Sequence, residues 1–315
     1  TPQPIAENDA LDRLDKIWRD SVDMHCRSDV GYGVFLSGGV DSSAVMAALA
    51  QRGDMSGIRP YTAYFDTPAV ADERSFAAAV VKATGAKGQE VAFTAHDFKT
   101  LLPAIAAYMD DPVADYAILP TWKLAATASL EQKVVLCGEG GDELFAGYGR
   151  YRPRWWKDWK QVFAPRDENM PAGWTALQRK QARDIAAYLP CDLLVKLDTC
   201  LMAHGLEGRT PFLDSEVARF AFALPDGLKL RGVNGKYLMK RWLDGKIPAA
   251  QPFRRKSGFT VPVGAWMAAD AKRLADLLTR HKLVADLLGR DALASLPARL
   301  QTPEGAKSCW ALLYL

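Results

Sequence analysis

The sequence predicts an α/β fold with a doubly wound parallel sheet, followed by a mainly helical C-terminal part. Short apolar, β-branched segments alternate with helical patterns over residues 1–150, which is typical of parallel strands joined by crossover helices. Residues 174–315 have mostly helical periodicity, and proline interrupts the stretch between these two parts. We therefore expect an α/β core over 1–150, a connector over 151–173 and a helical part over 174–315.

The expected elements begin with an amphipathic helix over residues 9–26, with Asp9 as its N-cap. The expected core strands are 34–36, 61–65, 89–93 and 134–137. The expected core helices are one that ends at Gly53, followed by 73–84, 103–109, 122–130 and 143–145. The C-terminal part has expected helices over 174–188, 192–203, 214–223, 236–243, 265–277 and 306–314. The carboxyl ends of parallel strands meet at one edge, so the loops at 37–42, 65–66 and 137–142 should share a ligand site.

The first of these loops joins a buried strand to a helix and reads SGGVDSS from Ser37. Gly38 and Gly39 allow the backbone to approach a ligand closely, and the helix N-terminus with the Ser42 hydroxyl favours an anion. The loop lacks both the G-x-x-x-x-G-K-[ST] and the G-x-G-x-x-G patterns, so it is not one of the common phosphate loops. The carboxylate of Asp41 fits an anion site if a divalent cation bridges it to phosphates. The alternative is a tight turn with serine caps.

The second loop follows the last core strand and reads CGEGGDELFAGYGRY from Cys137. Asp142 could join Asp41 in holding a metal beside a polyphosphate. Glu139 is placed to accept a proton from a nucleophile or to hold a cationic one. The alternative is a solvated acidic turn that caps a short helix, and for Glu143 the two interpretations stand level.

Composition limits the classes of function. The net charge is only +3, from 40 Lys and Arg against 37 Asp and Glu, so bulk charge does not indicate a nucleic-acid partner. The sequence has no apolar run of membrane-spanning length and no signal-peptide pattern, so we expect a soluble, cytoplasmic protein with no membrane partner. The five cysteines show no C-x-x-C spacing, which argues against a disulfide framework and a zinc site. Because the chain begins Thr-Pro, we expect it to be a fragment or a processed product.

Several motifs together resemble the asparagine synthetase family in order and spacing. They read SGGVDSS, DDPVADYAILPTWKLA, VVLCGEGGDELFAGYGRY, MAHGLEGRTPFLD and FRRKSGFTVP. The resemblance covers nearly the whole chain and implies a sheet of the ATP pyrophosphatase type, also called adenine nucleotide alpha hydrolase-like. It implies that a carboxylate attacks the α-phosphate of ATP, that pyrophosphate leaves, and that ammonia then displaces AMP.

The resemblance also assigns roles to residues. Lys236 matches the lysine that neutralises charge at the reacting phosphate, and Lys256 lies in the loop that closes on pyrophosphate. Magnesium would be held by Asp41 and Asp142, and Glu139 would act in the ammonia step. The residues expected to seat adenine and ribose lie at strand ends: Phe35, Leu36, Ala63, Cys137 and Gly138.

Three further segments have alternative interpretations. Residues 150–166 are basic and aromatic and could bind single-stranded RNA, although a connector with packed tryptophans is favoured. Glu207, Arg209 and Asp214 are expected to form a buried polar network that supports the site. Arg254 could meet a polyphosphate, but a surface charge is the simpler interpretation.

The acceptor acid stays open at this stage. Aspartate is the acid that the family implies, but Tyr116 stands where the family commonly has serine, so an acid of a natural product or a sugar is an alternative. The family's glutaminase domain is not recognisable in the chain. Ammonia would therefore come from solution or from a glutaminase domain or subunit.

Overall fold

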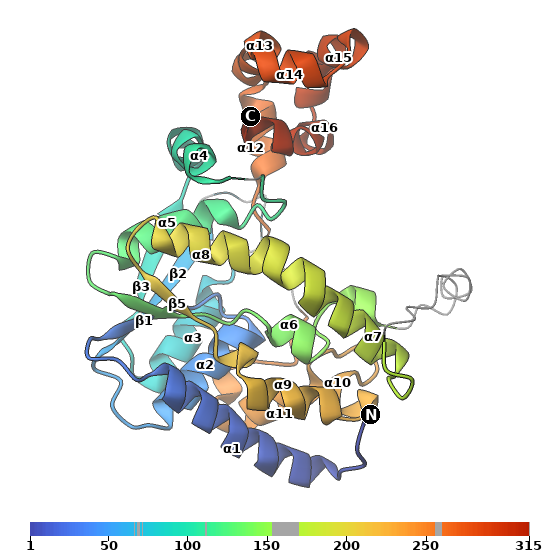
Figure 1. Cartoon of the computed structure of the whole chain (residues 1–315). Coiled ribbons are helices and arrows are strands. Elements are labelled where there is room, and N and C mark those ends of the chain that lie inside the picture. Colours follow the sequence, from blue (N-terminus) through green and yellow to red (C-terminus); the bar gives the residue numbers. More distant parts are fainter. Residues whose placement is uncertain are drawn as a thin grey trace.

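A parallel β-sheet forms the centre of the protein in the computed structural model, which describes residues 1–65, 67, 70, 72–110, 112–152, 170–255 and 260–314. Its five strands are ordered β3-β2-β1-β4-β5, and every pair of neighbours is parallel (Figure 1). The strands are β1 (Tyr32–Phe35), β2 (Ile58–Phe65), β3 (Gln89–Phe93), β4 (Val134–Leu136) and β5 (Glu207–Arg209). The predicted α/β class with a doubly wound parallel sheet is confirmed. Within the described ranges, no helix is both long and apolar enough to cross a membrane.

Helices cover both faces of the sheet. One face packs against α2 (Val40–Ala50), which α1 (Glu7–His25) and α11 (Tyr237–Lys246) cover in turn. All residues of α2 from Ser42 to Leu49 are buried, as expected for a helix with neighbours on every side. The other face packs against α5 (Ile118–Ala128) and α8 (Val195–Met202). Helices on both faces shield the strands from water, as a fully parallel sheet requires.

The edge strand β5 is a difference from the prediction. Its sequence, Glu-Gly-Arg, lacks apolar alternation, so no strand was expected there. The expected buried network is also wrong. Glu207 is exposed and pairs with Arg209 at 2.7 Å, and the Arg209 guanidinium also donates to the carbonyls of His25 and Arg27. Asp214 instead caps α9 (Ser215–Ala223), accepting from the Val217 amide at 3.4 Å and from the preceding amide.

A continuous helical segment replaces the two separate helices that were expected over 174–188 and 192–203. It consists of α7 (Ala176–Arg183), a π-helix η3 (Asp184–Leu194) and then α8. Pro190 lies inside η3 and, having no N–H, donates no backbone hydrogen bond there. π-Helical turns are rare and frequently occur at functional sites.

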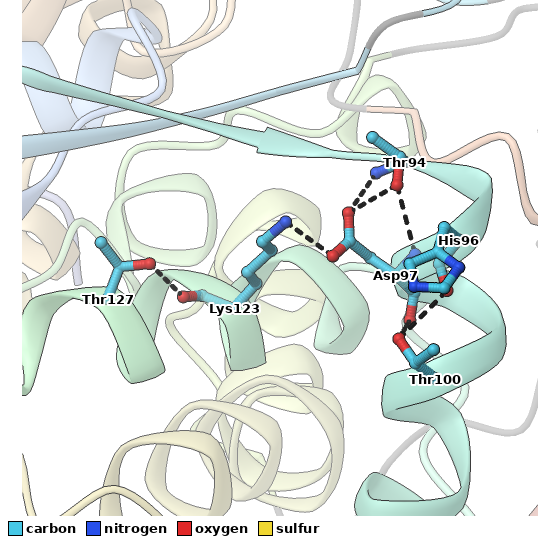
Figure 2. Close-up of polar contacts among 6 residues, drawn as sticks. All are labelled: Thr94, His96, Asp97, Thr100, Lys123 and Thr127. Carbon is cyan, nitrogen blue, oxygen red and sulfur yellow. Dashed lines mark hydrogen bonds and ion pairs between the residues drawn. The ribbon is translucent and has the colours of Figure 1, made fainter.

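Helix α4 (Ala95–Tyr108) begins earlier than the predicted helix over 103–109. Thr94 and Asp97 form a capping box, in which the Thr94 hydroxyl accepts from the Asp97 amide at 3.2 Å (Figure 2). Figure 2 also shows Lys123 of α5 donating to Asp97 at 2.6 Å, which ties the two helices together. The capping pattern was present in the sequence and identifies the start of the helix.

The C-terminal helices pack together beyond the sheet, at the top of Figure 1. Trp266 connects them to the sheet, because its ring lies 5.9 Å from Phe65 and 5.6 Å from Phe93. The single helix predicted over 265–277 is divided at Asp270. The elements of this part are α12 (Val263–Ala269), α13 (Ala271–Arg280), α14 (Lys282–Leu287), α15 (Arg290–Leu300), α16 (Pro303–Ser308) and η6 (Trp310–Tyr314).

Short elements complete the chain. They are α3 (Arg74–Thr84), α6 (Gly141–Leu144), η1 (Gly149–Tyr151), η4 (Pro211–Leu213), α10 (Asp226–Lys229) and η5 (Pro248–Ala250). The first helix begins after Ala6, so Asp9 lies inside it and is not its N-cap. The division into parts at 151–173 remains a prediction, because 153–169 lie outside the described residues.

Candidate active site

A cavity of about 1080 Å³ lies at the carboxyl ends of β1, β2 and β4. Its walls come from the loop after β1, the loop after β4, the turn before α11, and the helices α5, η3 and α8. Ligand pockets commonly measure about 300–1,000 Å³, so this cavity has room for more than one small ligand. The loops at 37–42 and 137–142 both line it, as predicted from the strand ends, whereas Phe65 does not line it and Asp66 lies outside the described residues.

The loop from Ser37 to Ser42 is held by hydrogen bonds to its own serine hydroxyls, as in a turn with serine caps, and this leaves the anion site a prediction. The Ser37 hydroxyl accepts from the Gly39 amide at 3.2 Å, and the Ser42 hydroxyl accepts from the Ser37 amide at 3.2 Å. Gly38 has φ +74°, and a Cβ there would lie 2.8 Å from the backbone nitrogen of Ala77. The first glycine of the motif is therefore required both by its conformation and by the close approach of α3. The loop leads directly into the N-terminus of α2, whose dipole favours a negative charge.

Lys236 lies between the two predicted metal ligands. Its side chain is almost fully buried, and Nζ contacts Asp142 Oδ1 at 2.6 Å and also contacts Asp41 Oδ2. Burial by itself would lower the pKa of the Lys236 ammonium, but Asp142 and Asp41 outweigh it and the pKa is raised. Gly147 permits this arrangement, since a Cβ there would lie 1.8 Å from Asp142 Oδ1 and 2.2 Å from Lys236 Cε.

The pair of carboxylates fits a magnesium ion that arrives with phosphates. In the described part of the chain, no three or more His, Cys, Asp or Glu side chains form a group that could hold a metal. Mg²⁺ in nucleotide sites is held by one or two carboxylates together with phosphate oxygens, and Asp41 and Asp142 supply two carboxylates. Since Lys236 contacts both, the ammonium and the cation would share these oxygens.

Glu139 lies in the same cavity, within electrostatic reach of Asp41 and of a second ion pair. Burial raises the pKa of the Glu139 carboxyl, and the ammonium of Lys196 only partly offsets this. Lys196 Nζ contacts Asp115 Oδ2 at 2.6 Å. Neither Asp115 nor Lys196 was predicted from the sequence as a site residue. A signal was available, because Lys196 interrupts the apolar run Leu-Leu-Val-Lys-Leu.

Glu143 is buried at the wall of the cavity. Its side chain is 1% exposed and Oε1 accepts from the Tyr148 hydroxyl at 2.5 Å, so the solvated acidic turn is wrong for this residue. Burial raises the pKa of the Glu143 carboxyl despite that hydrogen bond. Gln181 of α7 donates to the carbonyls of Glu143 and Leu144 at 2.6 and 2.7 Å. These contacts fix the short helix α6, which carries Asp142.

The strand-end residues predicted to seat adenine and ribose divide into two groups. Phe35, Leu36, Ala63 and Gly138 line the cavity. Cys137 is 1% exposed and packs in the core beside Leu201 and Leu206, so its side chain does not reach a ligand. Burial raises the pKa of the Cys137 thiol well above its usual value.

Arg254 is not a surface charge. Its guanidinium donates to the Gly38 carbonyl at 3.2 Å, pairs with Glu73 at 3.2 Å and lies 3.6 Å from the ring centre of Phe76. It therefore connects the loop after β1 to α3 and to the segment before residue 256. Lys256 lies outside the described residues, while Arg255 lines the cavity.

Arg150, the first residue of the basic and aromatic segment, has internal partners. Its guanidinium lies 4.0 Å from the ring centre of Tyr148 and 4.8 Å from that of Tyr188, and Nε contacts Asp184 at 3.0 Å. These contacts tie the loop after β4 to η3. Asp66, Asp111 and residues 153–169, which include the three tryptophans of the basic and aromatic segment, lie outside the described residues.

Comparisons with known proteins give one family. A family model described as asparagine synthase matches residues 13–315. The chain is 34% identical to a protein of Mycobacterium bovis named "Putative asparagine synthetase (glutamine-hydrolyzing)", over 84% of this chain and 51% of that protein. It is 29% identical to "Asparagine synthetase (glutamine-hydrolyzing) 1" of Bacillus subtilis, over 79% of this chain and 49% of that protein. It is 26% identical to "Asparagine synthetase B (glutamine-hydrolyzing)" of Escherichia coli, over 79% of this chain and 44% of that protein. The chain thus spans about half the length of these relatives.

Proposed function

Since this chain belongs to the asparagine synthase family, we propose that it forms an amide from a carboxylic acid and ammonia with the use of ATP. The acid is aspartate, and its side-chain carboxylate is activated as an acyl-adenylate. The observation that carries this proposal is the contact of Lys236 with both Asp41 and Asp142 beside the Ser37–Ser42 loop. Such a site combines an anion-binding loop, a fixed cation and a pair of magnesium-binding oxygens, all of which a leaving pyrophosphate requires.

In the first step, a carboxylate oxygen of the acid attacks the α-phosphorus of ATP. The bond from that phosphorus to the bridging oxygen breaks, and pyrophosphate leaves with the bonding electrons. The amides at the N-terminus of α2, in the second half of the Ser37–Ser42 loop, and the ammonium of Lys236 stabilise the negative charge that develops on the phosphates. Magnesium held by Asp41 and Asp142 would neutralise part of this charge.

In the second step, the nitrogen of ammonia attacks the acyl carbon and the bond from that carbon to the AMP oxygen breaks. The nitrogen must then lose a proton. Glu139 lies in the cavity, and burial raises the pKa of its carboxyl, which makes it a stronger proton acceptor than an exposed glutamate. We assign this proton to Glu139. Ammonia would be free in solution or supplied by a glutamine-hydrolysing domain or subunit, as the names of the relatives suggest.

The test is ATP–pyrophosphate exchange over a panel of acids. We expect exchange that requires both aspartate and magnesium. Asp41→Asn should abolish it, because the variant loses the carboxylate beside Lys236. The matched control is Asp244→Asn, which changes an exposed aspartate of α11. Exchange with another acid but not with aspartate would correct the substrate, and exchange with no acid would overturn the proposal.

A further inference from the structure

A second charged cluster lies in the cavity and has no part in the phosphate chemistry. Lys196 Nζ contacts Asp115 Oδ2 at 2.6 Å, and the other oxygen of Asp115 accepts from the Ala117 amide at 2.9 Å. Asp192 accepts from the Asp115 amide at 3.3 Å. Both Asp115 and Lys196 line the cavity, and Glu139 is within their electrostatic reach. The cluster is thus next to the residue assigned to the ammonia step.

The π-helix η3 builds this end of the cavity. Tyr188 and Leu193 of η3 line the wall, and Asp192 reaches Asp115. A regular α-helix over the same residues would rotate its side chains to other directions, since a π turn contains more residues. The rare geometry therefore occurs where two of its side chains line the cavity and a third, that of Asp192, contacts Asp115, which points to a role in binding and not only in packing.

The charges of the cluster match an α-amino acid. An ammonium group can donate three hydrogen bonds, and Asp115 accepts only one from Lys196, so Lys196 can also bind a carboxylate. Asp115, Asp192 and Glu139 are three carboxyl groups around one lysine, and this excess favours a second cation. A free α-carboxylate and a free α-ammonium on one ligand would satisfy both requirements.

A buried ion pair contributes little net stability to a protein. Taking two charges out of water costs about as much as their attraction returns, and well-packed apolar residues often serve as well. Lys196 is 5% exposed, while the side chain of Asp115 is 26% exposed and reaches the cavity. The pair is better explained as a pre-arranged recognition site than as a stabilising contact.

We propose that the Asp115–Lys196 pair recognises the acceptor acid, with Asp115 contacting its α-ammonium group and Lys196 its α-carboxylate. The proposal rests on the proposed function, because it assumes that the cavity holds an acid beside the nucleotide. It limits the acceptor to α-amino acids whose second carboxylate reaches the α-phosphate of ATP. Both residues are specificity-determining and take no proton in the reaction.

Two substrate analogues separate the two contacts. Succinate is aspartate without the α-ammonium group, and β-alanine is aspartate without the α-carboxylate. Binding of each to the full chain is measured by calorimetry with a non-hydrolysable ATP analogue present. We expect the parent protein to bind aspartate at least tenfold more tightly than either analogue, since a hydrogen bond to a charged group contributes about 1.5–3 kcal/mol.

The variants test the individual residues. Asp115→Asn should weaken aspartate binding by roughly 10–100-fold and remove most of the preference over succinate, and Lys196→Gln should do the same for the preference over β-alanine. The affinity for the ATP analogue should change by less than about threefold. The matched control is Asp198→Asn, an exposed aspartate on the same helix. Because a single variant leaves a buried charge unpaired and can unfold, the double variant provides a folded form without either charge.

Each outcome decides between the two claims. Equal binding of aspartate and both analogues by the parent would overturn the inference, and so would variants that weaken the ATP analogue and leave aspartate unchanged. Selective aspartate binding without any ATP–pyrophosphate exchange would support this inference and refute the proposed function. Exchange with aspartate that Asp115→Asn and Lys196→Gln leave unchanged would support the function and refute the inference.

Discussion

Replacing Lys229 with methionine should make the protein more stable at pH 7. Lys229 is fully buried in α10, its Nζ donates to Gln181 Oε1 at 3.0 Å, and the cavity lining does not include it. Burial lowers the pKa of this ammonium from 10.5 to about 8, although Asp226 partly opposes the change. Gln181 in turn holds two carbonyls of α6, so Lys229 belongs to the support of the loop after β4.

The magnitude follows from the two pKa values. A pKa that falls from 10.5 to about 8 corresponds to a cost of about 3 kcal/mol for keeping this lysine charged in the folded state. The cost is fully present below pH 8, where folded and unfolded chains are both protonated. Between pH 8 and 10.5 only the unfolded chain keeps the proton, so the stability of the parent rises with pH.

Methionine removes this cost but also removes the donor to Gln181. A buried acceptor without its donor costs about 1–3 kcal/mol, so the net gain at pH 7 should be about 1 kcal/mol. The stability advantage of the methionine variant should shrink and then reverse by about pH 10. At that pH Lys229 is neutral in the folded parent, so the parent has lost most of the cost of burying the charge. Urea denaturation at a series of pH values measures both effects, with the exposed Lys272→Met as the control for loss of a lysine. A variant less stable at pH 7, with a difference that stays constant up to pH 10, would refute the reasoning.

Three further predictions concern the cavity. Gly147→Ala should reduce exchange activity by about 10²-fold, since its Cβ would displace Asp142 and Lys236; a rate like that of the parent would contradict the described approach. Glu139→Gln should keep ATP–pyrophosphate exchange but reduce amide formation by about 10²–10⁴-fold, and equal loss in both assays would argue against its role in the second step. Arg254→Gln should raise the KM for ATP by roughly tenfold with little effect on the KM for the acid, because the contacts it loses, to Gly38, Glu73 and Phe76, all support the loop after β1 and the adjoining α3; an unchanged KM for ATP would show that these contacts have no such role.

The parts of the site that the sequence predicts correctly are those that directly follow strands. In a parallel sheet these segments must meet at one edge, so Asp41 and Asp142 could be placed together without knowledge of the strand order. Lys236 joined them through the family resemblance, and the structure shows its ammonium between the two carboxylates. Local sequence patterns therefore predicted most of the residues that lie at the phosphate end of the cavity.

The acceptor end was not predictable in the same way. Asp115 and Lys196 are 81 residues apart, and their contact depends on how α8 packs over α5. The π-helix before α8 has no periodicity of its own that single-sequence patterns detect, and the sequence was instead interpreted as two helices over 174–188 and 192–203. Cys137 was placed at the ligand because it ends a strand, but the last side chain of a buried strand can point into the core, as this one does.

The most direct test of the proposed chemistry follows an oxygen atom. Aspartate labelled with ¹⁸O in its side-chain carboxylate is incubated with ATP, magnesium and ammonia, and the AMP is analysed by mass spectrometry. If the carboxylate attacks the α-phosphorus, one labelled oxygen remains on AMP for each amide that forms. Label in inorganic phosphate with ADP as the product, or AMP without label, would contradict the acyl-adenylate and with it the central claim.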